Sequence, residues 1–205
     1  MGQPPGYRVR QELMDADRVS RTLARMAHEV MERHPQAGAT VLVGVQTRGV
    51  PLARRLAAII KHARGTAPAV GSLDITLYRD DLTTIAAHPV LKGTQIPVSI
   101  DGRAVVLVDD VLFTGRTARA ALDELIDFGR PARIALAVLV DRGHRELPIR
   151  ADYVGKAVTT ARAEIVQVML REEDGEDRVL LLEPAEAAPA RPPARARKAK
   201  GGRRK

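Results

Sequence analysis

Short unbroken runs of apolar residues alternate along the chain with stretches whose apolar residues recur every three or four positions. The unbroken runs are rich in β-branched residues, which is typical of strands buried on both faces. They predict strands at 40–45, 104–108 and 133–140, with one more short strand at 153–156. Residues 69–78 also predict a strand, because Leu73, Ile75 and Leu77 alternate with Asp74 and Thr76. The amphipathic stretches predict helices at 14–34, 51–61 and 118–128.

Strands and helices in this alternating order predict an α/β fold, in which a mostly parallel sheet is flanked by helices. Residues 1–10 show no such pattern and are expected to form an irregular lead-in. The polar stretch 79–100 is too long for an ordinary connection and predicts a mobile flap. This flap could contain a β-hairpin formed by residues 90–91 and 96–100.

A smaller unit is expected nearer the C-terminus. Residues 164–170 and 178–182 predict a closing hairpin across the acidic turn 172–177, which would form a small hood region. One main domain is expected over residues 1–183, because 205 residues with a 45% hydrophobic composition can bury a proper core. The remaining residues, 184–205, include no large apolar side chain and are expected to be a disordered basic tail.

The net charge of +8 is concentrated in this tail. Residues 184–205 carry eight Lys or Arg and one acid, Glu186, so the tail accounts for +7 and the rest of the chain for +1. The high pI therefore says little about the folded domain. Two interpretations of the tail stay open: a solubilising extension, and an arm that contacts nucleic-acid phosphates without sequence preference.

Composition also restricts the compartment and the chemistry. The chain has no cysteine, which excludes a disulfide framework and thiolate catalysis. Its first residues form no apolar leader, and no apolar run reaches transmembrane length. A cytoplasmic protein is expected.

Polar motifs follow four of the predicted strands. They are QTRG at 46–49, RDD at 79–81, DDVLFTGRT at 109–117 and DRGHRELPIR at 141–150. Because ligands bind outside the carboxyl ends of parallel strands, these motifs are expected to converge on one site. Adjacent carboxylates suit hydroxyls or a cation, and a Gly/Thr loop at the mouth of a helix suits a phosphate. The expected ligand carries both a sugar diol and a phosphate.

The pair Asp109-Asp110, followed by Thr114-Gly115-Arg116-Thr117, resembles the phosphoribosyl-pyrophosphate (PRPP) motif of type I phosphoribosyltransferases. The segments VGVQTRGVPLARRLA, DITLYRDDL, VDDVLFTGRT and VLVDRGHRELPIRADYVGK, in that order, are similar to the PyrR family, which combines regulation of the pyrimidine operon with uracil phosphoribosyltransferase activity. The resemblance runs from about Asp17 to Leu182. Phe113 stands where the family usually has Tyr, a change that we expect the loop to tolerate because its backbone holds the phosphate.

The resemblance implies that uracil and PRPP react to give UMP and pyrophosphate. The implied catalytic residues are Asp109 and Asp110, which would hold the ribose hydroxyls, and Arg48, which would take the pyrophosphate. The implied PRPP- and UMP-binding residues are Thr47, Arg48, Gly49, Arg79, Asp80, Asp109, Asp110, Val111, Leu112, Phe113, Thr114, Gly115, Arg116 and Thr117. The implied uracil-binding residues are Asp141, Arg142, Gly143 and Ile149. No protein metal site is expected, because Mg²⁺ would arrive with PRPP.

The resemblance also implies a second function, the binding of pyr mRNA leaders when UMP is present. The implied RNA-binding residues are Arg21, Arg25, His28, Arg33, His144, Arg145, Arg150 and Lys156. With two Phe and three Tyr, the chain offers few stacking platforms, so RNA contacts should depend on charge and hydrogen bonds and be sensitive to salt. A homodimer or higher homo-oligomer, which would enlarge this surface, is also implied.

Structural interpretations of some of these residues stay open. The basic face of the first helix could be an ordinary solvated surface, and His144 could be structural. At the level of function, the alternatives are a purine-type phosphoribosyltransferase without an RNA role and a catalytically weak UMP sensor. The intact DDVLFTGRT and QTRG loops argue against the sensor.

Overall fold

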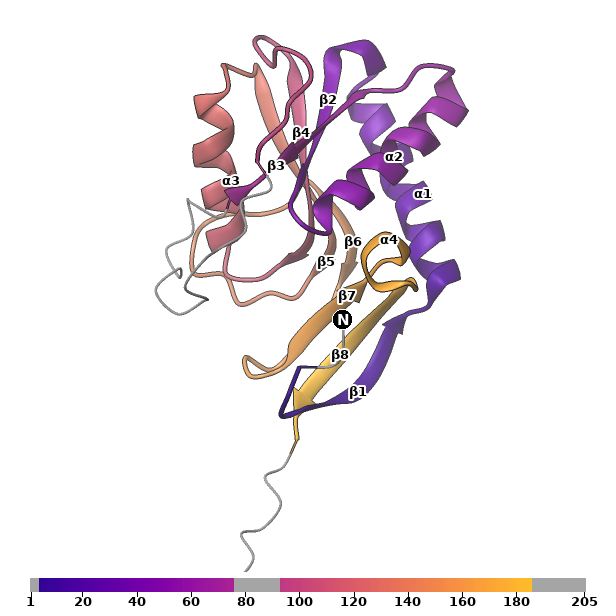
Figure 1. The fold of residues 1–205 in the computed structure, drawn as a ribbon, viewed down its shortest axis with the longest axis vertical. Coiled ribbons are helices and arrows are strands. Elements are labelled where there is room, and N and C mark those ends of the chain that lie inside the picture. The colour runs from indigo at the N-terminus through magenta and orange to yellow at the C-terminus, as the bar shows by residue number, and fades with distance from the viewer. Residues whose placement is uncertain (1–3, 76–92, 186–205) are drawn as a thin grey trace, which may run out of the picture.

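A computed structural model of the chain describes residues 4–75 and 93–185 (Figure 1). Its larger sheet has five strands in the order β3-β2-β4-β5-β6, and all four pairings are parallel. The strands are β2 (Thr40–Val45), β3 (Ala69–Leu73), β4 (Ala104–Leu112), β5 (Arg133–Asp141) and β6 (Tyr153–Ala157). The long helices are α1 (Ala16–Arg33), α2 (Gly49–Arg64) and α3 (Arg116–Asp127). The predicted α/β fold with a mostly parallel sheet is confirmed.

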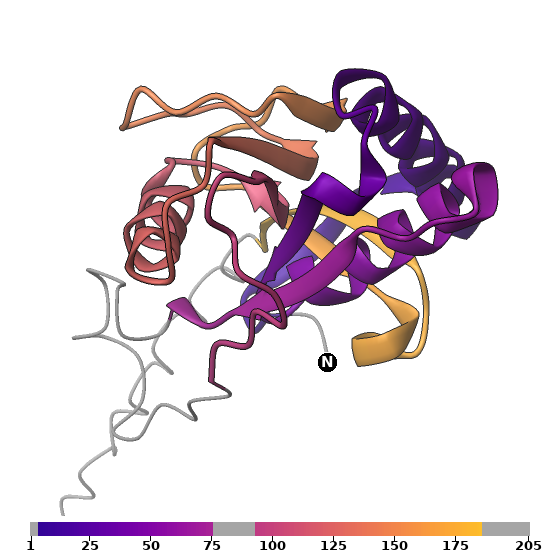
Figure 2. The ribbon, with the colours of Figure 1, turned by 90° about the horizontal axis from the view of Figure 1, so that it is seen from above.

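Helices cover both faces of this sheet, α1 and α2 on one face and α3 on the other (Figures 1 and 2). In β4, Val106 and Val108 belong to the core under α1 and α2. Their neighbours Val105 and Leu107 belong to the core under α3. Because successive side chains of a strand point to opposite faces, a strand between two helical layers must be apolar at every position. This explains the unbroken runs in the sequence.

A second, antiparallel sheet forms the hood, with strand order β1-β8-β7. Its strands are β1 (Tyr7–Met14), β7 (Ile165–Met169) and β8 (Arg178–Pro184). The predicted closing hairpin is confirmed as β7 and β8. The expected irregular lead-in at 1–10 is wrong, because residues 7–10 belong to β1.

β1 was not predicted from the sequence, because polar contacts rather than apolar burial hold much of it. Only its last two residues are buried. The rest of the strand forms ion pairs across the hood, Arg8 with Glu183, Arg10 with Glu164 and Glu12 with Arg178. Its alternation is therefore incomplete, since Tyr7, Val9 and Leu13 share one face with Gln11, and Val9 is exposed.

Several boundaries differ from the prediction. β4 continues through both acids to Leu112, β3 ends at Leu73, and α2 and α3 begin two residues earlier than expected. The turn 172–177 contains the short helix α4 (Arg171–Asp174). β8 includes Pro184, and the N–H of Ala185 donates to the carbonyl of Gly6, so the first two residues assigned to the tail are part of the hood.

Parts of the sequence prediction lie outside the described residues. These are residues 76–78 of the predicted strand 69–78, residues 79–92 of the flap with one strand of the suggested hairpin, and the tail from 186. Residues 96–100, the other suggested strand, form no strand; nearby, Ser72 and Gln95 make a single antiparallel bridge. No helix in the described ranges combines the length and apolar character that crossing a membrane requires.

The start of α2 packs against β4 through a close backbone contact at Gly49. A Cβ atom at this position would lie 2.3 Å from the carbonyl oxygen of Val108. The turn after β2 can therefore reach the carboxyl end of β4 only with glycine here.

Replacing Gly49 with Ala should force α2 away from β4, because backbone atoms cannot yield as a side chain can. We expect the free energy of unfolding to fall by about 1–3 kcal/mol, the usual cost of overpacking. Thermal unfolding of the variant measures this. Gly38→Ala is the control, since a Cβ there meets nothing within 4 Å, and its melting temperature should stay close to that of the unchanged protein. Equal melting temperatures for both variants would contradict the assignment.

Candidate functional site

Two adjacent carboxylates stand near the carboxyl end of the central strand β4. Asp109 is buried and Asp110 is partly buried. An oxygen of Asp109 accepts the N–H of Asp110 at 2.9 Å, and an oxygen of Asp110 accepts the N–H of Val111 at 2.8 Å. Burial raises the pKa of Asp110, and the nearby positive charge of Arg48 opposes this rise. The acid pair thus lies in a site that favours a positive or hydroxylic partner.

The loop after β4 leads into the N-terminus of α3 as the sequence predicts. Its cap residue is Gly115, with a left-handed φ of 95°, and the hydroxyl of Thr114 accepts the N–H of Arg116 at 3.4 Å. A Cβ on Gly115 would also lie 3.4 Å from Leu147 and 3.5 Å from Ile149. These are ordinary van der Waals distances, so it is the left-handed backbone and not the space that favours glycine here. The N-terminus of a helix presents N–H groups to an anion.

Backbone hydrogen bonds join this loop to the segment 141–150. The carbonyl of Thr114 accepts the N–H groups of Glu146 at 2.9 Å and Leu147 at 3.1 Å. The guanidinium of Arg145 donates to the carbonyl of Phe113 at 2.6 Å and forms an ion pair with Asp141. The structure thus brings together the predicted phosphate loop and the predicted uracil segment.

The side chains of Arg142, Phe113 and His144 pack together beside this junction. The guanidinium of Arg142 lies 4.0 Å from the ring centroid of Phe113, and the ring of His144 meets Phe113 edge-on at 5.7 Å. Arg142 is 6% exposed, and burial lowers its pKa. It donates to the hydroxyl of Thr160 at 3.3 Å, while a ring nitrogen of His144 lies 2.7 Å from the carbonyl oxygen of Thr160. The side chains of Arg142 and His144 therefore connect the segment to the start of the hood.

The loop after β2 brings Arg48 to the same edge of the sheet, next to β4. Arg48 makes a bidentate pair with Asp174 of α4, with Nε 3.1 Å from Oδ2 and Nη2 2.8 Å from Oδ1. Burial lowers the pKa of Arg48, but hydrogen bonding to Asp174 and the charges of Asp174 and Asp110 outweigh it, so the pKa is raised overall. Sequence reasoning missed Asp174, whose only signal was its place in an acidic run that reads as a solvated turn.

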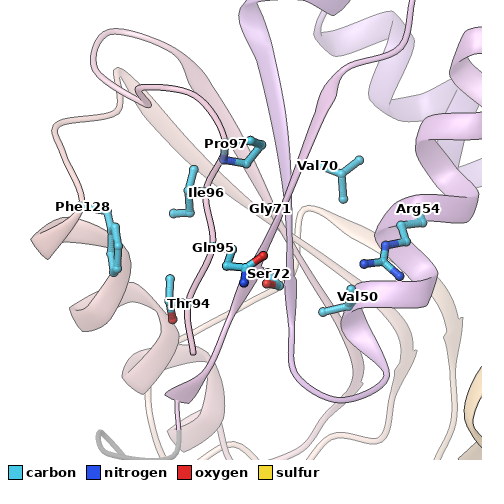
Figure 3. A pocket seen from close by; sticks show the side chains of 10 residues that line it. All are labelled: Val50, Arg54, Val70, Gly71, Ser72, Thr94, Gln95, Ile96, Pro97 and Phe128. Carbon is cyan, nitrogen blue, oxygen red and sulfur yellow. The ribbon is translucent and has the colours of Figure 1, made fainter. Parts of the chain in front are cut away.

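Two cavities lie near the loop after β2 and the start of α2. One of about 240 Å³ is lined by Gln46, Thr47, Val50, Arg54, Ser72, Gly93, Gln95 and Glu173. The other, of about 500 Å³, flanks the edge strand β3 (Figure 3). Figure 3 shows Val50 and Arg54 of α2 on one side of β3 and Ile96 and Phe128 on the other. Among the described residues that line the larger cavity, none is a predicted site residue.

The basic residues predicted to bind RNA fall into two groups. Arg25 and Arg33 of α1 lie against β6: Arg25 donates to the carbonyls of Val154 and Gly155, and Arg33 lies 5.1 Å from the ring centroid of Tyr153. Lys156, also on β6, donates to the carbonyl of Leu13 at 3.1 Å, and burial lowers its pKa.

Arg21 and His28 also lie on α1, where both are exposed. The second group, His144 and Arg145, belongs to the junction with the phosphate loop, where both side chains are hydrogen-bonded. Arg150 lies in the same segment and is exposed. Arg79 and Asp80 lie outside the described residues. Within residues 4–75 and 93–185, no group of three or more His, Cys, Asp or Glu side chains is placed to hold a metal ion.

Solved structures with a similar fold are phosphoribosyltransferases. A hypoxanthine-guanine phosphoribosyltransferase from Bacillus anthracis superposes with a TM-score of 0.64 at 17% identity, covering 86% of this chain and 98% of that one. A hypoxanthine phosphoribosyl transferase from Trypanosoma cruzi gives 0.66 at 17% identity, covering 85% and 92%. At such identities the likeness establishes the fold alone.

Sequence comparison identifies the family. The model of the phosphoribosyl transferase domain matches residues 10–173. The chain is 59% identical over 179 residues to the "Bifunctional protein PyrR" of Pelotomaculum thermopropionicum, covering 87% of this chain and 99% of the relative. It is 60% identical over 176 residues to the protein of the same name from Thermus thermophilus, covering 86% and 97%. The chain belongs to the phosphoribosyltransferase family and, within it, to the bifunctional PyrR proteins.

Proposed function

We propose that this protein transfers the phosphoribosyl group of PRPP to uracil, which yields UMP and pyrophosphate, and that it controls pyrimidine genes by binding pyr mRNA when UMP is bound. The observation that carries the proposal is the meeting of Asp109, Asp110, Arg48 and the N-terminus of α3 at one edge of the sheet. The identity with PyrR proteins supports the choice of a pyrimidine over a purine base.

The chemistry asks for positioning and charge more than for a nucleophile. Breaking the bond from C1′ to pyrophosphate builds positive charge on the ribose and negative charge on the leaving group. Asp109 and Asp110 accept hydrogen bonds from the ribose hydroxyls and stabilise the developing positive charge. The loop 114–117 holds the 5′-phosphate through its N–H groups, and Arg48 receives the pyrophosphate.

Base recognition falls to the segment 141–149, largely through its backbone. Asp141, Gly143 and Ile149 remain candidates for direct contact with uracil. Arg142 acts indirectly, because its guanidinium packs on the ring of Phe113. The flap residues Arg79 and Asp80 would close over PRPP and exclude water, which would otherwise hydrolyse the activated sugar.

Mg²⁺ would enter with the pyrophosphate group and neutralise part of its charge. The site suits this arrangement, since its oxygen donors are carboxylates at the end of β4, which hard cations prefer. Burial that raises the pKa of Asp110 also indicates that this carboxylate gains from a nearby cation.

RNA binding would use the face formed by α1 and β6. The predicted residues Arg25, Arg33 and Lys156 gather there, although each also holds a structural contact. Arg21 is exposed and serves as a cleaner probe of the surface. A homodimer would double this face, and the tail 186–205 could add a sequence-independent arm.

Purified protein should release pyrophosphate from PRPP with uracil and not with hypoxanthine, guanine or orotate. Arg48→Ala should reduce kcat/KM for PRPP by about 10²–10³, the scale for losing one charge-stabilising donor. The control is Arg119→Ala on the exposed face of α3, which should match the unchanged protein. Turnover with a purine base would overturn the uracil assignment. Tight UMP binding without turnover would favour the sensor.

Asp110→Asn should make the protein more stable at neutral pH while lowering kcat by about 10²-fold or more. The raised pKa means that the folded protein disfavours the charged carboxylate. The stability of the unchanged protein therefore falls as the pH rises from the ordinary Asp range through the raised pKa. The stabilisation by Asn should appear in melting curves above that range and vanish at lower pH.

Asp101→Asn provides the control of opposite sign. Hydrogen bonds from the N–H of Arg130 and from Ser99 lower the pKa of Asp101, so its charged form is favoured in the folded state. This variant should be less stable than the unchanged protein at neutral pH. A destabilised Asp110→Asn protein would contradict the assigned environment of that carboxylate.

For RNA binding, Arg21→Glu should weaken the UMP-dependent affinity for a pyr leader RNA about tenfold or more and reduce the slope of log K against log salt by about 1. Uracil turnover should be unchanged. Arg119→Glu, the same charge reversal on α3 across the sheet, is the control and should leave RNA affinity intact. Equal losses in both variants would mean that only overall charge matters.

A further inference from the structure

The hood contributes a buried carboxylate to the pyrophosphate edge of the site. Asp174 lies on α4, 126 residues from Arg48 along the chain, and its side chain is 1% exposed. It accepts hydrogen bonds from Nε and Nη2 of Arg48, the two nitrogens of one edge of the guanidinium. This bidentate geometry fixes the plane of the guanidinium as well as its distance.

Asp174 is itself held in place from both sides. Its Oδ2 accepts the N–H of Leu170 at 3.0 Å, and its own N–H donates to the carbonyl of Leu170 at 2.7 Å. Burial raises the pKa of Asp174, but the hydrogen bonds from Arg48 and Leu170 outweigh it, so the pKa is lowered overall. Asp174 is therefore an oriented anion at neutral pH.

A second arginine fastens the same segment to α2. Arg55 donates through Nε to Glu172 at 2.8 Å and through Nη2 to Asp177 at 2.6 Å. Asp177 also accepts the N–H of Arg171 at 2.9 Å. The segment 170–177 thus has two attachments, one to Arg48 in the loop after β2 and one to Arg55 in α2.

The contact leaves a defined part of Arg48 for a ligand. Within residues 4–75 and 93–185, the hydrogen bonds of the Arg48 guanidinium involve Nε and Nη2, and none involves Nη1. The charge of Asp110 also acts on Arg48. Arg48 is therefore hydrogen-bonded to a hood carboxylate and also feels the charge of a strand carboxylate of the reaction site.

We propose that Asp174 is a positioning residue for the phosphoribosyl transfer, which orients Arg48 so that it receives the pyrophosphate group without reorganising. The inference rests on the proposed function, in which Arg48 contacts pyrophosphate. An arginine free to sample many rotamers would lose that freedom on binding each substrate molecule, and a fixed one has lost it already. The hood is then part of the catalytic apparatus.

The test compares Asp174→Asn with Asp177→Asn, which makes the same chemical change three residues away but touches Arg55. Both should lower the melting temperature modestly. Only Asp174→Asn should raise the KM for PRPP and the Kd of magnesium pyrophosphate, each about tenfold, with the KM for uracil unchanged. Asp174→Glu, which keeps the charge but displaces it by one methylene, should fall between Asp174→Asn and the unchanged protein and serves if the Asn variant folds poorly.

Arg48→Ala and the double variant Arg48→Ala/Asp174→Asn complete the experiment. If Asp174 acts through Arg48, the double variant binds pyrophosphate no more weakly than Arg48→Ala alone. An Arg48→Ala protein with normal pyrophosphate binding would refute the role of Arg48 in the proposed function. A weakened Arg48→Ala protein beside a normal Asp174→Asn protein would leave that function standing and overturn this inference.

Three other results would also overturn it. Additive losses in the double variant would show that Asp174 acts independently of Arg48. Equal losses in Asp174→Asn and Asp177→Asn would reduce the effect to loosening of the hood. Tighter pyrophosphate binding by Asp174→Asn would show that Asp174 competes with the ligand for Arg48.

Discussion

Two adjacent carboxylates near the end of a buried strand are electrostatically costly, and the surrounding structure has to offset that cost. The effect is visible at Asp110, whose pKa is raised by burial and pulled back by Arg48. Arg48 can reach it because β2 and β4 are neighbours in the sheet and Gly49 lets the intervening turn approach Val108. Asp174 then pairs with Arg48 from the hood. The cation Arg48 thus interacts with two carboxylates, Asp110 of β4 and Asp174 of α4, and the three residues are distant in sequence.

The other half of the site depends on hydrogen bonds more than on charge. Backbone bonds to Thr114 and the guanidinium of Arg145 join the phosphate loop to the segment that follows β5. A nucleotide bound to the loop would therefore contact a unit that includes residues 141–150. In the proposed function the same loop binds PRPP as substrate and UMP as product, so catalysis and the response to UMP would begin at the same atoms.

Much of this arrangement could be predicted from the sequence. Strands buried on both faces, such as Val105 to Val108, have an unambiguous pattern, and in a parallel sheet their order brings the polar motifs to one edge. β1 was missed because Gln11 interrupts its apolar face and half of the strand is polar or charged, with pairs such as Arg8 with Glu183. The continuation of β4 to Leu112 was hidden for a similar reason, since strands rarely contain two acids in a row.

Side-chain direction was the other limit of the sequence. The motif DRGHRELPIR identified the right segment, but spacing alone does not show that Arg142 and Arg145 turn their guanidinium groups into the protein. Asp174 was harder still, because a carboxylate in an acidic run looks solvated until the fold brings an arginine to it. Its partner Arg48 lies 126 residues earlier in the chain, and contacts of that range depend on how the hood packs on α2. The hood is built from both ends of the described chain. The orientation of the Arg48 guanidinium therefore depends on residues that lie outside the sequence motifs of the site.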